Sequence, residues 1–280
     1  MSNIDTALRI VDKFQATTPQ EGVAWILDRD QTLNRLRAIL RQPELIHQRA
    51  LNACGPAVFF RTWFSRDPVA AANFSCTLLR DGSAQIGSLT VNAGWKLLGQ
   101  NYSKLRSYTD GLKPGSTPET ADWMLLSALR QSENLWWDYA GEPNTAADYA
   151  AGITLPGTVT GWLNATNVYS NVNDGTSLVL PSDKSVLLNL QTPPHLDVIL
   201  LVDSSVTSLY LTPIADIPDR GWVPIPNHYI AMLSPITLQP EDSRWLHIDI
   251  WTWGSNRSGW QGSEKLLNNY FGAIVATVKG

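Results

Sequence analysis

The sequence predicts an α+β fold in which helices come first and strands follow. Residues 1–151 carry apolar side chains at helical spacing, whereas residues 152–280 carry short β-rich runs separated by turn residues. A chain of 280 residues with 44% hydrophobic and 16% charged residues can bury a substantial core. We therefore expect one domain over 1–280, built from a mainly helical lobe (1–151) and a mainly β lobe (152–280).

Capping residues and prolines predict where the first two helices begin and end. Asn3 or Asp5 can cap a first helix, which ends before Pro19. Asp30 can cap a second helix, in which leucines recur at helical spacing up to Pro43. These two helices belong to the fold or cover a site, and the sequence is compatible with both.

Three further helices are predicted by prolines, because proline is accepted in the first turn of a helix and breaks its interior. Cys54 precedes Gly55-Pro56 and an apolar run, so a helix begins at this cysteine. Asp67-Pro68 and Thr117-Pro118 mark the starts of two more.

The second half of the chain is expected to form strands. Short runs rich in β-branched and aromatic residues are separated there by turn residues. The runs are 157–169, 177–180, 186–190, 196–202, 208–212, 227–233, 245–253 and 273–278.

Cys54 is the candidate nucleophile. A helix N-terminus carries free N–H groups and a partial positive charge, which favour thiolate over thiol. The alternative is that Cys54 is a buried, inert cysteine. We expect Cys76, which lies in an apolar run, to be buried and inert. A Cys54–Cys76 disulfide is also possible and would silence the nucleophile.

A thiol nucleophile needs a base, and the base needs an orienting partner. His228 opens one β-run, and Asp249 lies on the following run, so the two can face each other if these runs form a hairpin. His195 or His247 could serve as the base instead, and Asn227 could orient it. His47 is expected at the surface.

Several classes of function are disfavoured by composition. The net charge of −4 gives no basic surface for nucleic acid, and no apolar run reaches the length of a membrane span. Two cysteines far from the histidines disfavour zinc, and no cofactor motif is present, so no metal or cofactor is expected. No cleaved signal peptide is visible, so we expect synthesis in the cytoplasm, with retention there or release by a signal-independent route.

These residues resemble the papain-like cysteine peptidase superfamily. The segment Cys54-Gly55-Pro56-Ala57 is similar to its bacterial Cys-Gly-Pro-Ala members, and Gln48 stands six residues before Cys54, at the spacing of the family's oxyanion-hole glutamine. Trp251-Thr252-Trp253-Gly254 resembles the family's Asn-Ser-Trp-Gly segment. Trp251 stands where the Asn belongs, and Asp249, two residues earlier, would replace it from the same face.

The resemblance implies a helical lobe with the cysteine helix packed on an antiparallel β-sheet or barrel lobe. It implies a thiol hydrolase that cleaves an amide bond of a protein or peptide, with Cys54, His228, Asp249 and Gln48 as its site, and suggests a bacterial secreted effector or toxin with a possible immunity or inhibitor protein. Alternatives are a peptidoglycan amidase, a deamidase or an acyltransferase on the same residues. A non-catalytic binding module that uses some of the 12 tryptophans is a further alternative.

Overall fold

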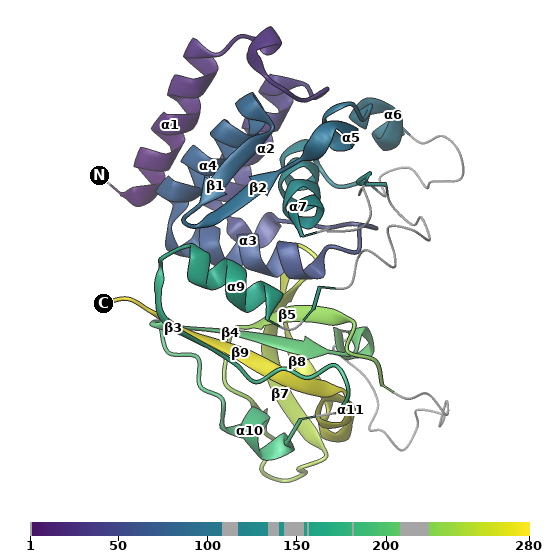
Figure 1. Cartoon of the computed structure of the whole chain (residues 1–280). Coiled ribbons are helices and arrows are strands. Elements are labelled where there is room, and N and C mark those ends of the chain that lie inside the picture. The colour runs from purple at the N-terminus through teal and green to yellow at the C-terminus, as the bar shows by residue number, and fades with distance from the viewer. Residues whose placement is uncertain are drawn as a thin grey trace. The chain divides into compact units, whose positions relative to one another are not determined.

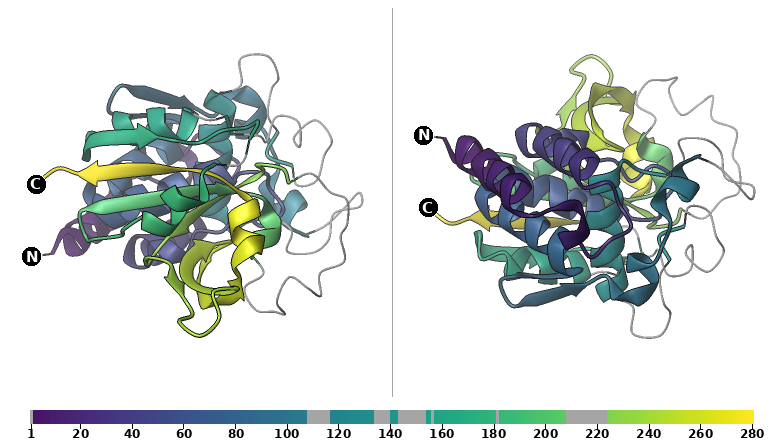
Figure 2. Two further views of the ribbon diagram at one scale, coloured as in Figure 1. Left: turned by 90° about the horizontal axis from the view of Figure 1, so that it is seen from below. Right: turned by 90° about the horizontal axis from the view of Figure 1, so that it is seen from above.

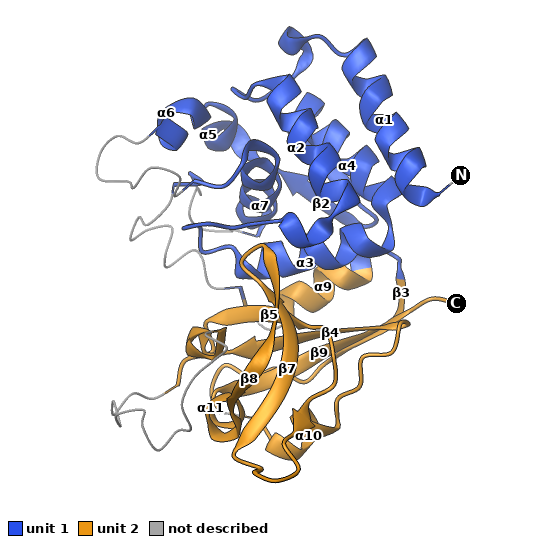
Figure 3. Ribbon diagram, turned by 180° about the vertical axis from the view of Figure 1, so that it is seen from behind, with its two compact units in different colours: residues 1–154, 165–168 blue, residues 155–164, 169–280 orange. Residues whose placement is uncertain are grey.

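The structure is a computed structural model of the whole chain. It describes residues 2–107, 117–133, 140–142, 154–155, 157–180, 182–207 and 224–280. Helices predominate in the first part and an antiparallel sheet in the second, which confirms the α+β class (Figure 1). The chain divides into two compact units (Figure 3). Unit 1 comprises Met1–Thr154 and Ala165–Val168, and unit 2 comprises Leu155–Asn164 and Tyr169–Gly280.

Unit 1 is a helical body with a small two-stranded sheet. Helix α1 packs along α2 and α4, and α7 packs against α2 and α3 (Figure 2). The α-helices are α1 (Asn3–Thr17), α2 (Arg29–Arg41), α3 (Cys54–Arg66), α4 (Pro68–Asp81), α5 (Gly94–Leu98), α6 (Tyr102–Ser107) and α7 (Thr120–Ser132). Two 3₁₀ turns, η1 (Gln20–Gly22) and η2 (Pro43–Leu45), and the strands β1 (Ser83–Ile86) and β2 (Leu89–Asn92) complete the unit.

Helices α3 and α4 begin where the prolines predict, but the predicted caps of the other helices were wrong. Ser2 caps α1 in a capping box with Asp5, so neither Asn3 nor Asp5 is the cap itself. Asp28, not Asp30, caps α2 by accepting a hydrogen bond from the Gln31 amide.

Helix α7 also begins later than predicted. Its N-cap position is Glu119, because the hydroxyl of the predicted cap, Thr117, donates instead to the Leu105 carbonyl. The Thr117 hydroxyl therefore bonds to a residue outside the helix and does not cap it.

The core of unit 1 is built around the apolar helix α3. Phe59, Phe60, Trp63 and Phe64 are all buried, and Phe74 of α4 packs against two of them with ring centroids 5.5 and 6.0 Å apart. A helix that is apolar on most of its surface has to be buried on most sides. The helix that begins at Cys54 is thus fixed along its length by aromatic packing.

Unit 2 contains a curled antiparallel sheet of half-barrel form, with strands in the order β3-β9-β4-β5-β7-β6 and β8 paired to β7. Alternate residues of β4, β5 and β7 face its core, together with Leu187 and Leu266 of two short helices. The strands are β3 (Tyr169–Asp174), β4 (Leu196–Val202), β5 (His228–Met232), β6 (Thr237–Leu238), β7 (Trp245–Thr252), β8 (Ser255–Gly262) and β9 (Tyr270–Val278). The helices are α9 (Thr158–Ala165), α10 (Lys184–Asn189), α11 (Ser263–Asn268) and the 3₁₀ turn η3 (Ser204–Thr207).

Two runs predicted as strands are helices. In 157–169, Val159, Trp162 and Leu163 are buried at helical spacing and form the inner face of α9. In 186–190, Asp183 caps α10 through the Ser185 amide, and only one residue of that helix, Leu187, is buried.

The other predicted runs had mixed outcomes. Residues 177–180 form no strand. The runs at 196–202, 227–233, 245–253 and 273–278 are confirmed as β4, β5, β7 and β9. The predicted strand at 208–212 lies outside the described residues.

Candidate active site

Cys54 is the first residue of α3, as the proline pattern predicts. The N-cap of the helix is Ala53, whose carbonyl accepts the Ala57 amide at 2.8 Å, and Cys54 is buried, with 9% exposure. The amides of Cys54 and Gly55 stand in the first turn, where N–H groups have no partner within the helix. Cys54 therefore lies at the positive end of a 13-residue helix.

The two cysteines are separate thiols, so the possible Cys54–Cys76 disulfide is not formed. Cys76 lies inside α4 with 5% exposure, and burial raises the pKa of its thiol to about 12. It is the buried, inert cysteine that the sequence predicts.

Gly55 permits a close approach at the start of α3. A β-carbon at this position would lie 2.6 Å from Cγ2 of Thr154, closer than side chains tolerate. The glycine after the cysteine is thus explained by packing of the first helical turn against Thr154.

Gln48 lies in the loop that joins η2 to α3. The residue is 8% exposed, and its carbonyl accepts the Leu51 amide at 3.0 Å. Within the described ranges, its side-chain amide has no hydrogen-bond partner, so it is available as a donor. The adjacent His47, half-buried rather than at the surface, accepts the Arg49 amide through Nδ1 at 2.7 Å.

His228 begins β5 and is buried, with 4% exposure. Its Nε2 shares a hydrogen bond of 2.7 Å with Oγ1 of Thr252, the last residue of β7. Alternation along β5 places His228 on the side of Ile230 and Met232, which face the core. Thr252 lies on the corresponding side of β7, with Ile248 and Ile250.

The ring of Trp253 covers His228, with ring centroids 4.9 Å apart. Trp253 and Gly254 form the two-residue turn between β7 and β8, with φ values of 47° and 75°. Such a turn requires positive φ at both central residues, which a tryptophan adopts only under strain. The guanidinium carbon of Arg257, on β8, lies 5.4 Å from the centroid of the Trp253 ring, within the range of a cation–π contact.

The environment keeps His228 neutral. Burial, assisted by the positive charge of Arg257, lowers the pKa of His228 to about 4. The imidazole is therefore unprotonated at neutral pH, although the lowered pKa also makes it a weaker base. The hydrogen bond to Thr252 occupies Nε2 and leaves Nδ1 as the second ring nitrogen.

The predicted pairing of His228 with Asp249 was wrong. Strands β5 and β7 do pair antiparallel, but Ala231 stands opposite Trp251, and the Leu233 amide donates to the Asp249 carbonyl. Asp249 thus lies level with Leu233, roughly 16 Å along the strand from His228. It also points to the opposite face, because Ile248 and Ile250 face the core.

Asp249 is the neighbour of His247 instead. Its Oδ1 lies 3.9 Å from His247 Nδ1, beyond hydrogen-bond distance, and Nε2 of the same ring is 3.3 Å from Ser258 Oγ. The amide oxygen of Asn227, the alternative orienting residue, accepts the Ser204 amide. His195, the other alternative base, precedes β4, and its carbonyl accepts the Val278 amide.

Sequence reasoning missed Thr252 as the partner of His228. Thr252 stands inside the Trp251–Gly254 segment that the sequence analysis singles out. Strand alternation was the available signal. Residues two apart on a strand face the same side, so a core-facing Ile250 implies a core-facing Thr252.

The candidate residues are distributed over both units. Cys54 and Gln48 belong to unit 1, and His228, Thr252 and Trp253 belong to unit 2. Association of Cys54 with His228 stays a prediction.

The described part of the chain contains no group of three or more His, Cys, Asp or Glu side chains placed to hold a metal ion. No helix in it is long and apolar enough to span a bilayer. Comparison with protein-family models, with curated proteins and with solved structures finds no match to this chain.

Proposed function

We propose that this chain is a thiol hydrolase of papain-like type that cleaves an amide bond. The observation that carries the proposal is the buried His228 imidazole, which Thr252 orients through one nitrogen and Trp253 shields from water. Cys54 at the positive end of α3 supports it from the other unit. An oriented neutral base and a thiol at a helix N-terminus are the two parts that nucleophilic thiol catalysis requires.

In this proposal His228 acts through Nδ1. The Nε2–H group donates to the Thr252 hydroxyl, and Nδ1 accepts the thiol proton of Cys54 as sulfur attacks the substrate carbonyl. His228 then gives that proton to the leaving amine as the C–N bond breaks, which leaves a thioester on Cys54. Water, deprotonated by His228, attacks the thioester, and the acid is released with the thiol restored.

The oxyanion of each tetrahedral intermediate is held by the Cys54 backbone N–H and the Gln48 side-chain amide. Each donor in such a site contributes roughly 3–4 kcal/mol to the transition state. The imidazolium formed in the first step is costly in the dry surroundings that lower the His228 pKa, so the nearby thiolate has to compensate its charge.

Selective labelling tests whether Cys54 is activated. Iodoacetamide at pH 7.5 is expected to alkylate Cys54 rapidly and to leave Cys76 unmodified, because at a pKa near 12 only about one thiol in 10⁴ to 10⁵ is ionised. Peptide mapping by mass spectrometry locates the adduct. Equal, slow labelling of both cysteines would contradict the proposal.

Cross-linking tests whether Cys54 and His228 meet. In a His228→Cys variant, dibromobimane should join Cys54 to the new thiol and become fluorescent, because both of its arms must react. The matched control is His247→Cys, which places a thiol on the same sheet and should give no cross-link. Absence of a cross-link in the folded His228→Cys protein would count against the pair.

The substrate can be sought with the same chemistry. Wild-type and Cys54→Ala proteins are incubated with protein mixtures and with peptidoglycan, and new termini are identified by mass spectrometry. New protein termini made only by the wild type indicate a peptidase, and released wall peptides indicate an amidase. A bacterial effector role, with an immunity or inhibitor protein as partner, remains part of this proposal.

A further inference from the structure

A fully buried carboxylate in unit 1 lies beneath the Gln48 loop. Asp122 of α7 is 0% exposed, and Arg35 of α2 donates to both of its oxygens, from Nε to Oδ2 at 2.6 Å and from Nη2 to Oδ1 at 3.0 Å. Removal of two charges from water is costly, and further hydrogen bonds are needed to offset that cost. The remaining partners of this pair therefore indicate what it holds in place.

Arg35 and Asp122 each form one further hydrogen bond, to the backbone of the segment just before Gln48. Arg35 Nη2 donates to the Leu45 carbonyl at 2.6 Å, and the His47 amide donates to Asp122 Oδ1 at 2.8 Å. The ion pair thus holds one carbonyl and one amide of residues 45–47, and the next residue in the chain is Gln48.

The chain after Gln48 is also constrained. Its carbonyl accepts the Leu51 amide, and Arg49 has a φ of 51°, which a residue other than glycine adopts only at an energetic cost. The hydrogen bond between Gln48 and Leu51 lies within the loop, and α3 begins soon after it, at Cys54. On the N-terminal side the anchor is the Arg35–Asp122 pair.

We infer that Arg35 and Asp122 are positioning residues for the Gln48 side chain as an oxyanion donor. They act through the backbone of residues 45–47 and touch no substrate. The inference rests on the proposed function, in which Gln48 is that donor. A purely structural role, in which the pair only joins α2 to α7, is the alternative.

Two reagents separate these roles without a known substrate. Acylation of Cys54 by p-nitrophenyl acetate forms a sulfur–carbon bond through a tetrahedral oxyanion, and p-nitrophenolate leaves. Alkylation by iodoacetamide displaces iodide directly and forms no oxyanion. The ratio of the two rates at Cys54 therefore reports oxyanion stabilisation and is insensitive to thiol reactivity or to the amount of folded protein.

Gln48→Ala should lower the acylation rate about 10²–10³-fold with alkylation unchanged. Asp122→Asn should lower it about tenfold or more, since a displaced catalytic group loses rate steeply with distance. In the Gln48→Ala background, Asp122→Asn should cause no further loss. Arg35→Lys keeps a positive charge beside Asp122 but loses the guanidinium fork that holds both Asp122 oxygens while Nη2 also donates to the Leu45 carbonyl. It should therefore lower the ratio in the same way if Asp122→Asn does not fold.

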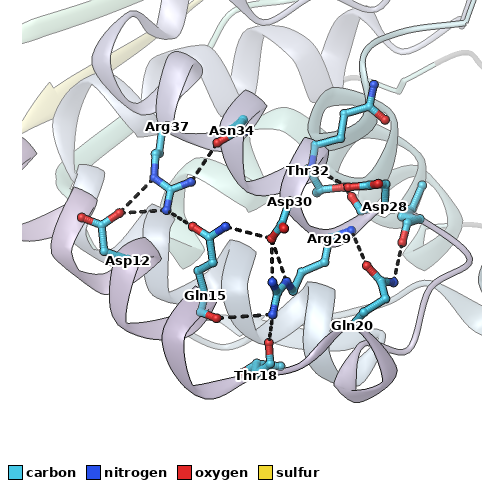
Figure 4. A network of polar contacts seen from close by, with 12 residues as sticks. Asp12, Gln15, Thr18, Gln20, Asp28, Arg29, Asp30, Thr32, Asn34 and Arg37 are labelled. Carbon is cyan, nitrogen blue, oxygen red and sulfur yellow. Dashed lines mark hydrogen bonds and ion pairs between the residues drawn. The ribbon is translucent and has the colours of Figure 1, made fainter.

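A second Arg–Asp ion pair, between α1 and α2, serves as the control, although its carboxylate is exposed. Arg37 donates to Asp12 from Nε at 3.0 Å and from Nη2 at 2.8 Å, within a polar network that joins α1 and α2 (Figure 4). Asp12→Asn should leave the ratio unchanged.

The outcomes distinguish this inference from the proposed function. If Gln48→Ala lowers the ratio but Asp122→Asn and Arg35→Lys do not, the positioning role is overturned and the hydrolase stands. Equal further loss from Asp122→Asn in the Gln48→Ala background would also overturn it. If wild-type Cys54 is not acylated at all, the proposed function fails and the inference fails with it.

Discussion

Two histidine clusters in unit 2 are built from similar residue types and differ in burial. The buried cluster consists of His228, Thr252 and Trp253, and the exposed cluster consists of His247, Ser258 and Trp260. Each pairs an imidazole with a hydroxyl and an indole, and both include residues of β7 or its neighbouring turn.

The two histidines lie on opposite faces of the sheet, so their surroundings differ. His228 faces the core side and is 4% exposed, whereas the side chain of His247 is 30% exposed and Trp260 is 41% exposed. Burial beside Arg257 lowers the pKa of His228 to about 4. The hydrogen bond of His228 is also the shorter one, 2.7 Å against 3.3 Å. Residue type therefore identifies a candidate base less well than the face of the sheet on which it lies.

The largest expected difference concerns activity. His228→Ala should lower acylation of Cys54 by p-nitrophenyl acetate about 10²–10⁴-fold, the range that a general base contributes. His247→Ala should leave the rate unchanged. Stopped-flow detection of p-nitrophenolate measures both variants, and equal rates for them would remove the functional distinction between the clusters.

The second difference concerns stability against pH. Because the pKa of His228 in the folded state, about 4, lies below its ordinary value of 6.5, the unfolded chain binds the proton first as the pH falls. The contribution of neutral His228 to the free energy of unfolding is therefore fully present above pH 6.5. It decreases as the pH falls, by about 3 kcal/mol near pH 4.

Urea unfolding of the wild type and His228→Gln between pH 7.5 and 4 measures this dependence. The difference between their unfolding free energies should change by that amount across the window. His247→Gln, the control, should retain the steep pH dependence that His228 causes. Parallel curves for the wild type and His228→Gln would show that His228 is not buried in neutral form.

The hydroxyl groups provide a smaller difference. Thr252→Val has nearly the same shape but leaves Nε2 of His228 without its partner, which should lower the free energy of unfolding by about 1–3 kcal/mol. Ser258→Ala, in the exposed cluster, should change it by less than about 0.5 kcal/mol. Urea unfolding at pH 7 compares them, and a silent Thr252→Val would remove Thr252 as the orienting residue.

The smallest expected effect is that of Asp249→Ala on acylation of Cys54. Asp249 lies beside His247 on the outer face, so its loss should leave the rate at the wild-type value. The same p-nitrophenolate assay checks this. A large loss of rate would restore Asp249 to the catalytic group and would require a different β5–β7 register.

The sequence alone determined the features that neighbouring residues encode. Gly55-Pro56 fixes the start of α3 at Cys54, Asp67-Pro68 fixes the start of α4, and short β-rich runs bounded by turn residues predict β4, β5 and β7. Proline geometry and β-rich composition act over a few residues, so they can be identified without knowledge of the fold.

Only the tertiary structure decided the partners of these elements. Asp249 and Thr252 both stood near the end of β7, and the pairing of β5 with β7 put Thr252 rather than Asp249 beside His228. Nothing local in the sequence indicated that Asp122 would be buried against Arg35, since the two are 87 residues apart in the chain. Register and burial depend on contacts between distant segments, and a one-residue change of register reverses the face of every side chain in a strand.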